Sequence, residues 1–179
     1  QFKEALELFS EIRKIESEPE YAVPAAYYAG VLHFGNQQYS EAIEDFKVAT
    51  NDPKYGEDVP TWITSAYLKE QKYKELIAYA EPLLDQPIGK FKTGNIAFIL
   101  GELQFNEGMY AKAAKSFGIL SDRNPELLTR ITQYKYGYSL FKLEQYPQAL
   151  QVFDQMPIGI DSLSQSIAFS KGIIQDELN

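Results

Sequence analysis

Residues 94–125, GNIAFILGELQFNEGMYAKAAKSFGILSDRNP, contain the pattern that decides the fold of this chain. Within this stretch, Tyr110, Ala113 and Phe117 form the motif aromatic-x2-Ala-x3-Phe. Offsets of three and seven residues place these side chains on one face of an α-helix. The small alanine allows a partner helix to approach closely, and the phenylalanine fills the space beside it. We therefore expect a helix here that packs tightly against another helix.

The motif recurs along the chain at a nearly constant spacing. Its four copies are Phe2-Ala5-Phe9, Tyr39-Ala42-Phe46, Tyr110-Ala113-Phe117 and Tyr146-Ala149-Phe153. A weaker copy, Tyr73-Leu76-Ala80, exchanges the large and the small residue. The first aromatic residues of successive copies are 34 to 37 residues apart. A period of this length is typical of stacked helical hairpins, because one hairpin cannot bury its apolar face alone.

A second landmark lies nine residues before each internal aromatic anchor. The landmark residues are Gly30, Thr64, Gly101 and Gly137, and Phe169-x2-Gly172 extends the series. Glycine inside a helix costs roughly 1 kcal/mol relative to alanine, so its recurrence requires a packing reason. A close crossing between two helices provides that reason. The pattern therefore predicts hairpins in which a first helix carries the landmark and a second helix carries the aromatic motif.

These landmarks and the turn residues between them predict an all-α chain of about ten helices. The expected helices cover residues 2–15, 23–36, 39–50, 57–70, 73–84, 93–107, 110–121, 127–143, 146–155 and 162–177. Proline and glycine clusters separate them, since neither residue favours a helix interior. No β-sheet is expected.

The repeating unit resembles the tetratricopeptide repeat. The copy that matches best contains Leu100-Gly101, Gly108, Tyr110, Ala113, Phe117 and Pro125. The chain departs from the family pattern where Gln104, His33 and Leu140 replace the tyrosine of the first helix. The resemblance implies a right-handed α-solenoid of stacked antiparallel helix pairs, in one array over residues 1–179. Its expected parts are a second helix at 1–16, full repeats at 23–56, 57–93, 94–129 and 130–161, and a first helix of a further repeat or a capping helix at 162–179.

The resemblance also implies a concave groove lined by first helices. Its side chains lie three residues before each landmark and one and four residues after it. The candidate partner-binding residues are Tyr27, Val31, Phe34, Phe98, Glu102, Phe105, Tyr134, Tyr138, Phe141 and Phe169. Aromatic residues are enriched at binding hot spots. Two alternatives remain open: these rings bind a partner, or they pack laterally between adjacent first helices and complete the core.

The residue inventory argues against several chemical classes of function. There is no cysteine, and His33 is the single histidine, so a transition-metal site is not expected. In the family pattern His33 replaces a packed tyrosine, so we expect a packed imidazole. The sequence lacks the common nucleotide-binding and hydrolase motifs, and we predict neither enzymatic activity nor a cofactor. With 17 basic and 25 acidic residues the net charge is −8, which disfavours nucleic acid as a partner.

The expected function is a scaffold that binds a peptide or partner protein, as part of a larger bacterial protein. The alternative is a structural spacer or self-assembly module. No run of 18 apolar residues exists, so no transmembrane segment is expected. The composition fits the cytoplasm and the periplasm equally. Because the chain begins with a second helix and ends with a first helix, we expect it to be a piece of a longer array. We also expect the isolated piece to self-associate through a terminal face.

Overall fold

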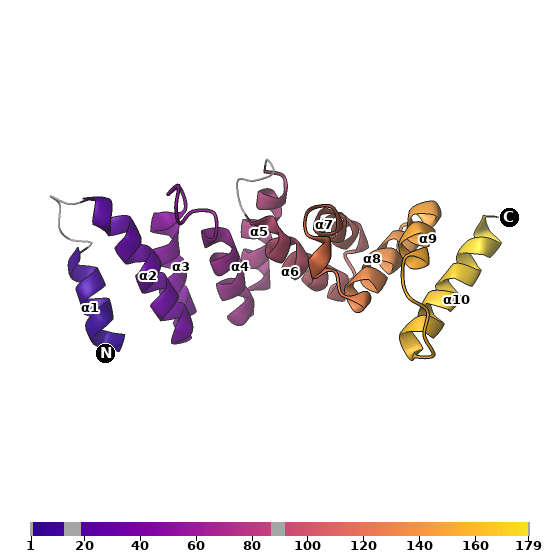
Figure 1. Ribbon diagram of the computed structural model, residues 1–179, viewed down its shortest axis with the longest axis horizontal. Coiled ribbons are helices and arrows are strands. Elements are labelled where there is room, and N and C mark those ends of the chain that lie inside the picture. The colour runs from indigo at the N-terminus through magenta and orange to yellow at the C-terminus, as the bar shows by residue number, and fades with distance from the viewer. Residues whose placement is uncertain (1, 13–18, 87–91, 179) are drawn as a thin grey trace. The chain divides into compact units, whose positions relative to one another are not determined.

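The computed structural model describes residues 2–12, 19–86 and 92–178, and all regular structure in these ranges is helical (Figure 1). Ten α-helices are present in the described ranges, and they contain no β-strand. The helices are α1 Phe2–Ile12, α2 Ala22–Gly35, α3 Tyr39–Ala49, α4 Val59–Lys69, α5 Tyr73–Leu84, α6 Thr93–Asn106, α7 Tyr110–Arg123, α8 Arg130–Lys142, α9 Tyr146–Asp154 and α10 Ser162–Glu177.

The predicted helices match the observed helices within three residues at each end that the structure describes. The expected residues 13–15 of the first helix lie outside the described residues. The largest difference is at α8, which begins at Arg130 and not at 127. Pro125–Leu127 forms a short 3₁₀ helix, and the Thr129 side chain then accepts a hydrogen bond from the Thr132 N–H. This cap satisfies a free N–H group of the first turn and fixes the start of α8.

The chain divides into two compact units, residues 1–92 and 93–179, and each is described by itself. The first unit contains α1 to α5 and the second contains α6 to α10. Within each unit, helices that follow one another in sequence pack together. The all-α prediction is confirmed for the described residues, and the single continuous array remains a prediction.

A close contact between glycine and phenylalanine recurs in three hairpins. A Cβ atom added to Gly30 would lie 2.9 Å from the Phe46 ring. The corresponding distances are 2.4 Å for Gly101 and Phe117, and 2.5 Å for Gly137 and Phe153. All three rings are fully buried or nearly so. The landmark glycines are therefore needed because the ring of the second helix occupies the place of their side chain. We call this the glycine–phenylalanine contact.

The remaining hairpin, α4–α5, reverses the sizes of the two residues. Thr64 stands at the glycine position and Ala80 at the phenylalanine position, and both are completely buried. The Thr64 hydroxyl donates to the Pro60 carbonyl at 2.7 Å, which satisfies the polar group inside the helix. The larger residue on the first helix thus compensates for the smaller residue on the second.

A second contact joins the two helices of each hairpin, between residues twelve positions apart. His33 Nδ1 lies 2.7 Å from Asp45 Oδ2. The Ser116 hydroxyl donates to Gln104 Oε1 at 2.7 Å, and both residues are buried. At the same place in the other two hairpins, the Tyr67 and Tyr79 rings have centroids 6.1 Å apart, and Leu140 and Val152 belong to one apolar cluster. Each hairpin therefore carries a different pair at an equivalent position.

The turn between the two helices requires a left-handed backbone residue in all four hairpins. This residue is Gln37 (φ 64°), Gln71 (φ 57°), Gly108 (φ 70°) or Glu144 (φ 59°). The next N–H donates to a carbonyl five residues back, as Met109 does to Gln104 at 2.8 Å. This is the Schellman arrangement, in which glycine is the favoured residue. Three of the four turns therefore carry a strained residue that is not glycine.

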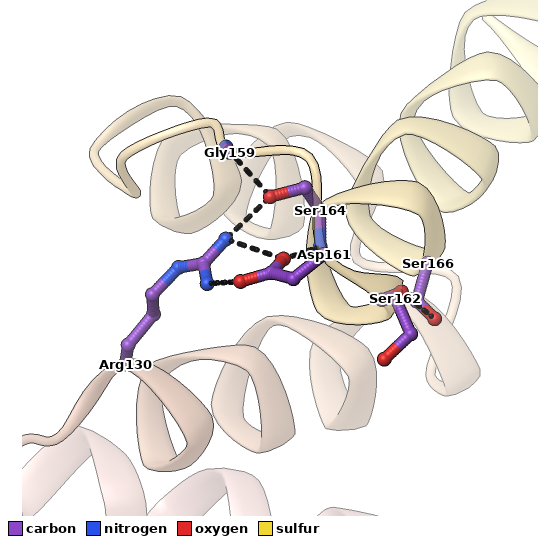
Figure 2. A network of polar contacts seen from close by, with 6 residues as sticks. All are labelled: Arg130, Gly159, Asp161, Ser162, Ser164 and Ser166. Carbon is purple, nitrogen blue, oxygen red and sulfur yellow. Dashed lines mark hydrogen bonds and ion pairs between the residues drawn. The ribbon is translucent and has the colours of Figure 1, made fainter.

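A polar network joins α8 to the start of α10 (Figure 2). The Arg130 guanidinium donates to both carboxylate oxygens of Asp161 and to Ser164 Oγ. Asp161 also accepts from the Ser164 N–H at 2.8 Å and thereby caps α10, while the Gly159 N–H donates to Ser164 Oγ at 2.7 Å. The hydrogen bond from Arg130 and those from Ser164 lower the pKa of Asp161 well below its ordinary value.

We predict that Gly101→Thr and Phe117→Ala compensate each other. Gly101→Thr should destabilise the chain by about 1–3 kcal/mol, because its Cβ collides with the ring. Phe117→Ala should cost about 3–5 kcal/mol through the cavity it leaves. The double variant reproduces the Thr64–Ala80 pair and should lose at least about 1 kcal/mol less than the sum. Urea melts of all four proteins give the coupling energy, and additive losses would contradict the prediction.

The turns provide a second prediction. Gln37→Gly, Gln71→Gly and Glu144→Gly should each raise stability by about 0.5–1 kcal/mol, because glycine adopts positive φ without a Cβ clash. Gly108→Ala should lower stability by about 1 kcal/mol, although a Cβ there meets no atom within 4 Å. Gln38→Gly is the matched control, since Gln38 has a φ of −90° and should gain nothing. The urea midpoints of these variants test the ranking.

The Asp161 network predicts a dependence of stability on pH. Because folding lowers the pKa of Asp161, its carboxylate stabilises the fold above the ordinary pKa of about 3.9. This contribution is lost as the pH falls from that value toward the lowered pKa. Asp161→Asn should therefore lower the urea midpoint at pH 7 and flatten its decline below about pH 4. Glu107→Gln, which alters an exposed carboxylate in the same unit, should leave the decline unchanged.

Candidate partner-binding surface

The ten candidate residues all lie on first helices, namely α2, α6, α8 and α10. Phe169 on α10 is the most open, with 71% of its surface exposed. The other nine are half-buried: Tyr27, Val31, Phe34, Phe98, Glu102, Phe105, Tyr134, Tyr138 and Phe141. None of the ten is fully buried, so each retains some surface that a partner could contact.

In the first unit, the candidate rings pack against neighbouring helices. Tyr27 meets Phe46 edge-on at 5.9 Å between centroids and lies 4.7 Å from Tyr55. Phe34 meets Trp62 edge-on at 5.0 Å, and Val31 packs against the same apolar cluster. The contact from Phe34 to Trp62 joins α2 to α4, two successive first helices. Lateral packing between first helices is therefore present in this unit.

In the second unit, the candidate rings form a connected row from α6 to α8. Tyr138 lies at its centre, 6.0 Å from Phe105, 5.8 Å from Tyr134 and 5.9 Å from Phe141. Phe98 is different, because it makes no ring-to-ring contact among the described residues and is still half-buried. Among the half-buried candidate rings, Phe98 is thus the one without a ring partner, and Phe169 is more open still.

Glu102 is paired with Lys135, one repeat further along the chain. The Lys135 ammonium donates to Glu102 Oε2 at 2.5 Å, with side chains 17% and 27% exposed respectively. Lys135 Nζ also lies 5.4 Å from the centroid of the Phe105 ring. The other carboxylate oxygen of Glu102, Oε1, is buried and has no hydrogen-bond partner in the described part of the chain. A single charged pair therefore lies within the aromatic row of the second unit.

Sequence reasoning identified Glu102 but not Lys135. The available signal was that the two residues have opposite charges and lie 33 positions apart, close to the repeat length. Two side chains at this spacing on successive first helices become lateral neighbours. Burial raises the pKa of the Tyr134 hydroxyl above its ordinary value.

A pocket of about 350 Å³ lies between α1, α2 and α3 in the first unit. Its lining residues are Lys3, Leu6, Glu7, Ser10, Ala29, His33 and Asp45. Serine, histidine and aspartate side chains thus meet at one place, as in nucleophilic hydrolases. No hydrogen bond joins Ser10 to His33 among the described contacts, although the serine needs this bond to transfer its proton to the imidazole. The His33–Asp45 contact is the pair twelve positions apart that joins α2 to α3 in this hairpin.

No group of three or more metal-ligating side chains occurs in residues 2–12, 19–86 and 92–178. The helices in these ranges include none with the length and hydropathy needed to cross a bilayer.

Compared with protein-family models, curated proteins and solved structures, the chain has no significant match. A functional proposal for this chain therefore depends on its residue pattern and on the geometry described above.

Proposed function

We propose that this chain is a protein-binding scaffold module of the tetratricopeptide type, a right-handed α-solenoid whose first helices form an aromatic groove. The recurring motif and the consecutive packing of the helices support this assignment. The ligand is a peptide or a partner protein, and the module performs no catalytic step. In this proposal the residues of the groove bind the ligand. The buried glycine–phenylalanine contacts keep the helices that form the groove in place.

The observation that carries the proposal is the partial exposure of a row of aromatic side chains. Phe105, Tyr134, Tyr138 and Phe141 form this row on α6 and α8 and are all half-buried, and Phe98 lies half-buried on α6 without a ring contact. Rings held by neighbouring rings lose little conformational entropy when a partner covers their remaining surface. Preorganised aromatic surface of this kind is typical of binding hot spots.

Glu102 adds a polar contact point within this row. Its Oε2 accepts from Lys135, and its buried Oε1 lacks a partner in the described residues. The Glu102 side chain is 27% exposed and its pair with Lys135 lies beside the aromatic rings, so a polar group of the ligand could contact this pair. The ligand we expect therefore combines an apolar or aromatic side chain with a neighbouring polar group.

A structural spacer is the second candidate function, because a specific contact favours it. Phe34 and Trp62 in the first unit, and Phe105 and Tyr138 in the second, join successive first helices. If such packing contacts are the sole role of the rings, truncating any ring lowers the stability of the fold and does not affect ligand binding. The two functions therefore differ in whether stability or ligand affinity responds to ring truncation.

We predict that Phe98→Ala and Tyr134→Ala abolish ligand capture with little effect on folding. A displayed library of random peptides is selected against the wild-type chain, and the consensus peptide is measured by calorimetry. Truncating a hot-spot ring costs about 2 kcal/mol or more, so each variant should weaken the peptide at least about 30-fold. The melting temperature should change by no more than a few degrees. Ile158→Ala, in an exposed loop, is the matched control and should bind normally.

Two outcomes would contradict the proposed function. One is a selection that yields no peptide whose binding depends on Phe98 or Tyr134. The other is a large loss of stability in both variants, which would identify the rings as core and favour the spacer.

A further inference from the structure

Three rings of the second unit, Phe105 on α6, Tyr110 on α7 and Tyr138 on α8, meet in one place. The ring centroids of Phe105 and Tyr110 are 5.8 Å apart, and both rings lie edge-on to Tyr138, at 6.0 and 5.9 Å. All three side chains are half-buried, and neither tyrosine hydroxyl has a hydrogen-bond partner among the described residues. We call this the three-ring cluster. It presents apolar surface together with two phenol groups that can donate a hydrogen bond to a ligand.

Two lysine ammonium groups lie beside the three-ring cluster. Lys135 Nζ is 5.4 Å from the centroid of the Phe105 ring, and Lys142 Nζ is 5.9 Å from the centroid of the Tyr110 ring. Lys135, Tyr138 and Lys142 follow one another on α8 at offsets of three and seven residues. These offsets place the three side chains on one face of the helix. The cluster is therefore flanked by positive charge on the face of α8 that carries the aromatic row.

The two lysines differ in how their charge is compensated. The Lys135 ammonium donates to Glu102 Oε2, so this charge is neutralised within the chain. Lys142 is exposed, and the described part of the chain supplies it with no carboxylate partner. Glu144 follows two residues later in the turn, but no ion pair joins it to Lys142 among the described contacts. Lys142 thus leaves a positive charge beside the rings.

This local charge is opposite to the charge of the whole chain. Helix α8 contains Arg130, Lys135 and Lys142 and no acidic residue, whereas the chain has a net charge of −8. At physiological ionic strength, exposed charges act over about 8 Å, so the groups next to the cluster decide which ligand charge is favoured there. A ligand that covers the rings also removes water from the ammonium and strengthens its attraction to a carboxylate. The surface is therefore complementary to an apolar group with a negative charge beside it.

We propose that the aromatic row of the second unit binds an acidic peptide. An apolar or aromatic side chain of the peptide covers the three-ring cluster, and a neighbouring aspartate or glutamate side chain binds the Lys142 ammonium. This inference rests on the proposed function and names the class of peptide that the groove takes. The hydroxyls of Tyr110 and Tyr138 are further donors, and a carboxylate accepts several hydrogen bonds at once.

The first test repeats the peptide selection with a reversed charge. Random peptides selected on the wild-type chain should be enriched in aspartate and glutamate next to an apolar residue. On Lys142→Glu the enrichment should change to lysine and arginine, because the charge beside the rings is reversed. Lys74→Glu is the matched control, since Lys74 is exposed on α5 in the first unit and the variant has the same net charge. It should still select acidic peptides.

The second test measures one selected peptide by calorimetry, with its C-terminus amidated. Replacing the acidic residue of the peptide with its amide should weaken binding to the wild-type chain about 5-fold at low salt. The same replacement should leave binding to Lys142→Gln unchanged, and the difference on the wild type should shrink as salt is added. Lys142→Gln should keep the wild-type melting temperature, because the lysine is exposed.

Three results would overturn the inference and leave the proposed function in place. The first is a selected peptide that requires Phe98 or Tyr134 and contains no acidic residue. The second is an acidic peptide that binds Lys142→Gln with wild-type affinity. The third is binding that disappears when the C-terminus is amidated, since the terminal carboxylate and not a side chain would then be recognised. A selection that yields no peptide would contradict both proposals.

Discussion

The close approach of two helices at a glycine facing a phenylalanine ring is the constraint on which the rest of this structure depends. With a side chain at Gly101, the Phe117 ring could not occupy its buried position, since the added atom would lie 2.4 Å from it. Once that contact fixes the separation of the helices, the connecting turn must reverse the chain within a few residues. This explains why Gln37 and Glu144 accept a left-handed conformation. The local strain in the turns follows from the packing requirement of the hairpin.

The residue pair twelve positions apart differs in chemistry from one hairpin to the next. A buried hydrogen bond closes α6–α7 through Gln104 and Ser116, whereas a histidine–carboxylate pair closes α2–α3. Exchanging α7 with α9 would place Val152 opposite Gln104 and remove the buried hydrogen bond from Ser116. Because losing a buried hydrogen bond is costly, this exchange is disfavoured. Similar helices in one chain are thereby directed toward their own neighbours.

The helices could be predicted from the sequence because packing imposes a strict period on Ala113, Phe117 and their equivalents. The strained turns could not, since Gln37 and Glu144 are not residues that signal positive φ. The pairing of Glu102 with Lys135 was also missed, because it depends on how successive first helices lie beside each other. For the same reason, the sequence did not determine how much of each candidate ring is exposed. The structure places nine of the ten residues between core and surface, and Phe34 and Phe105 also contact rings of the next first helix.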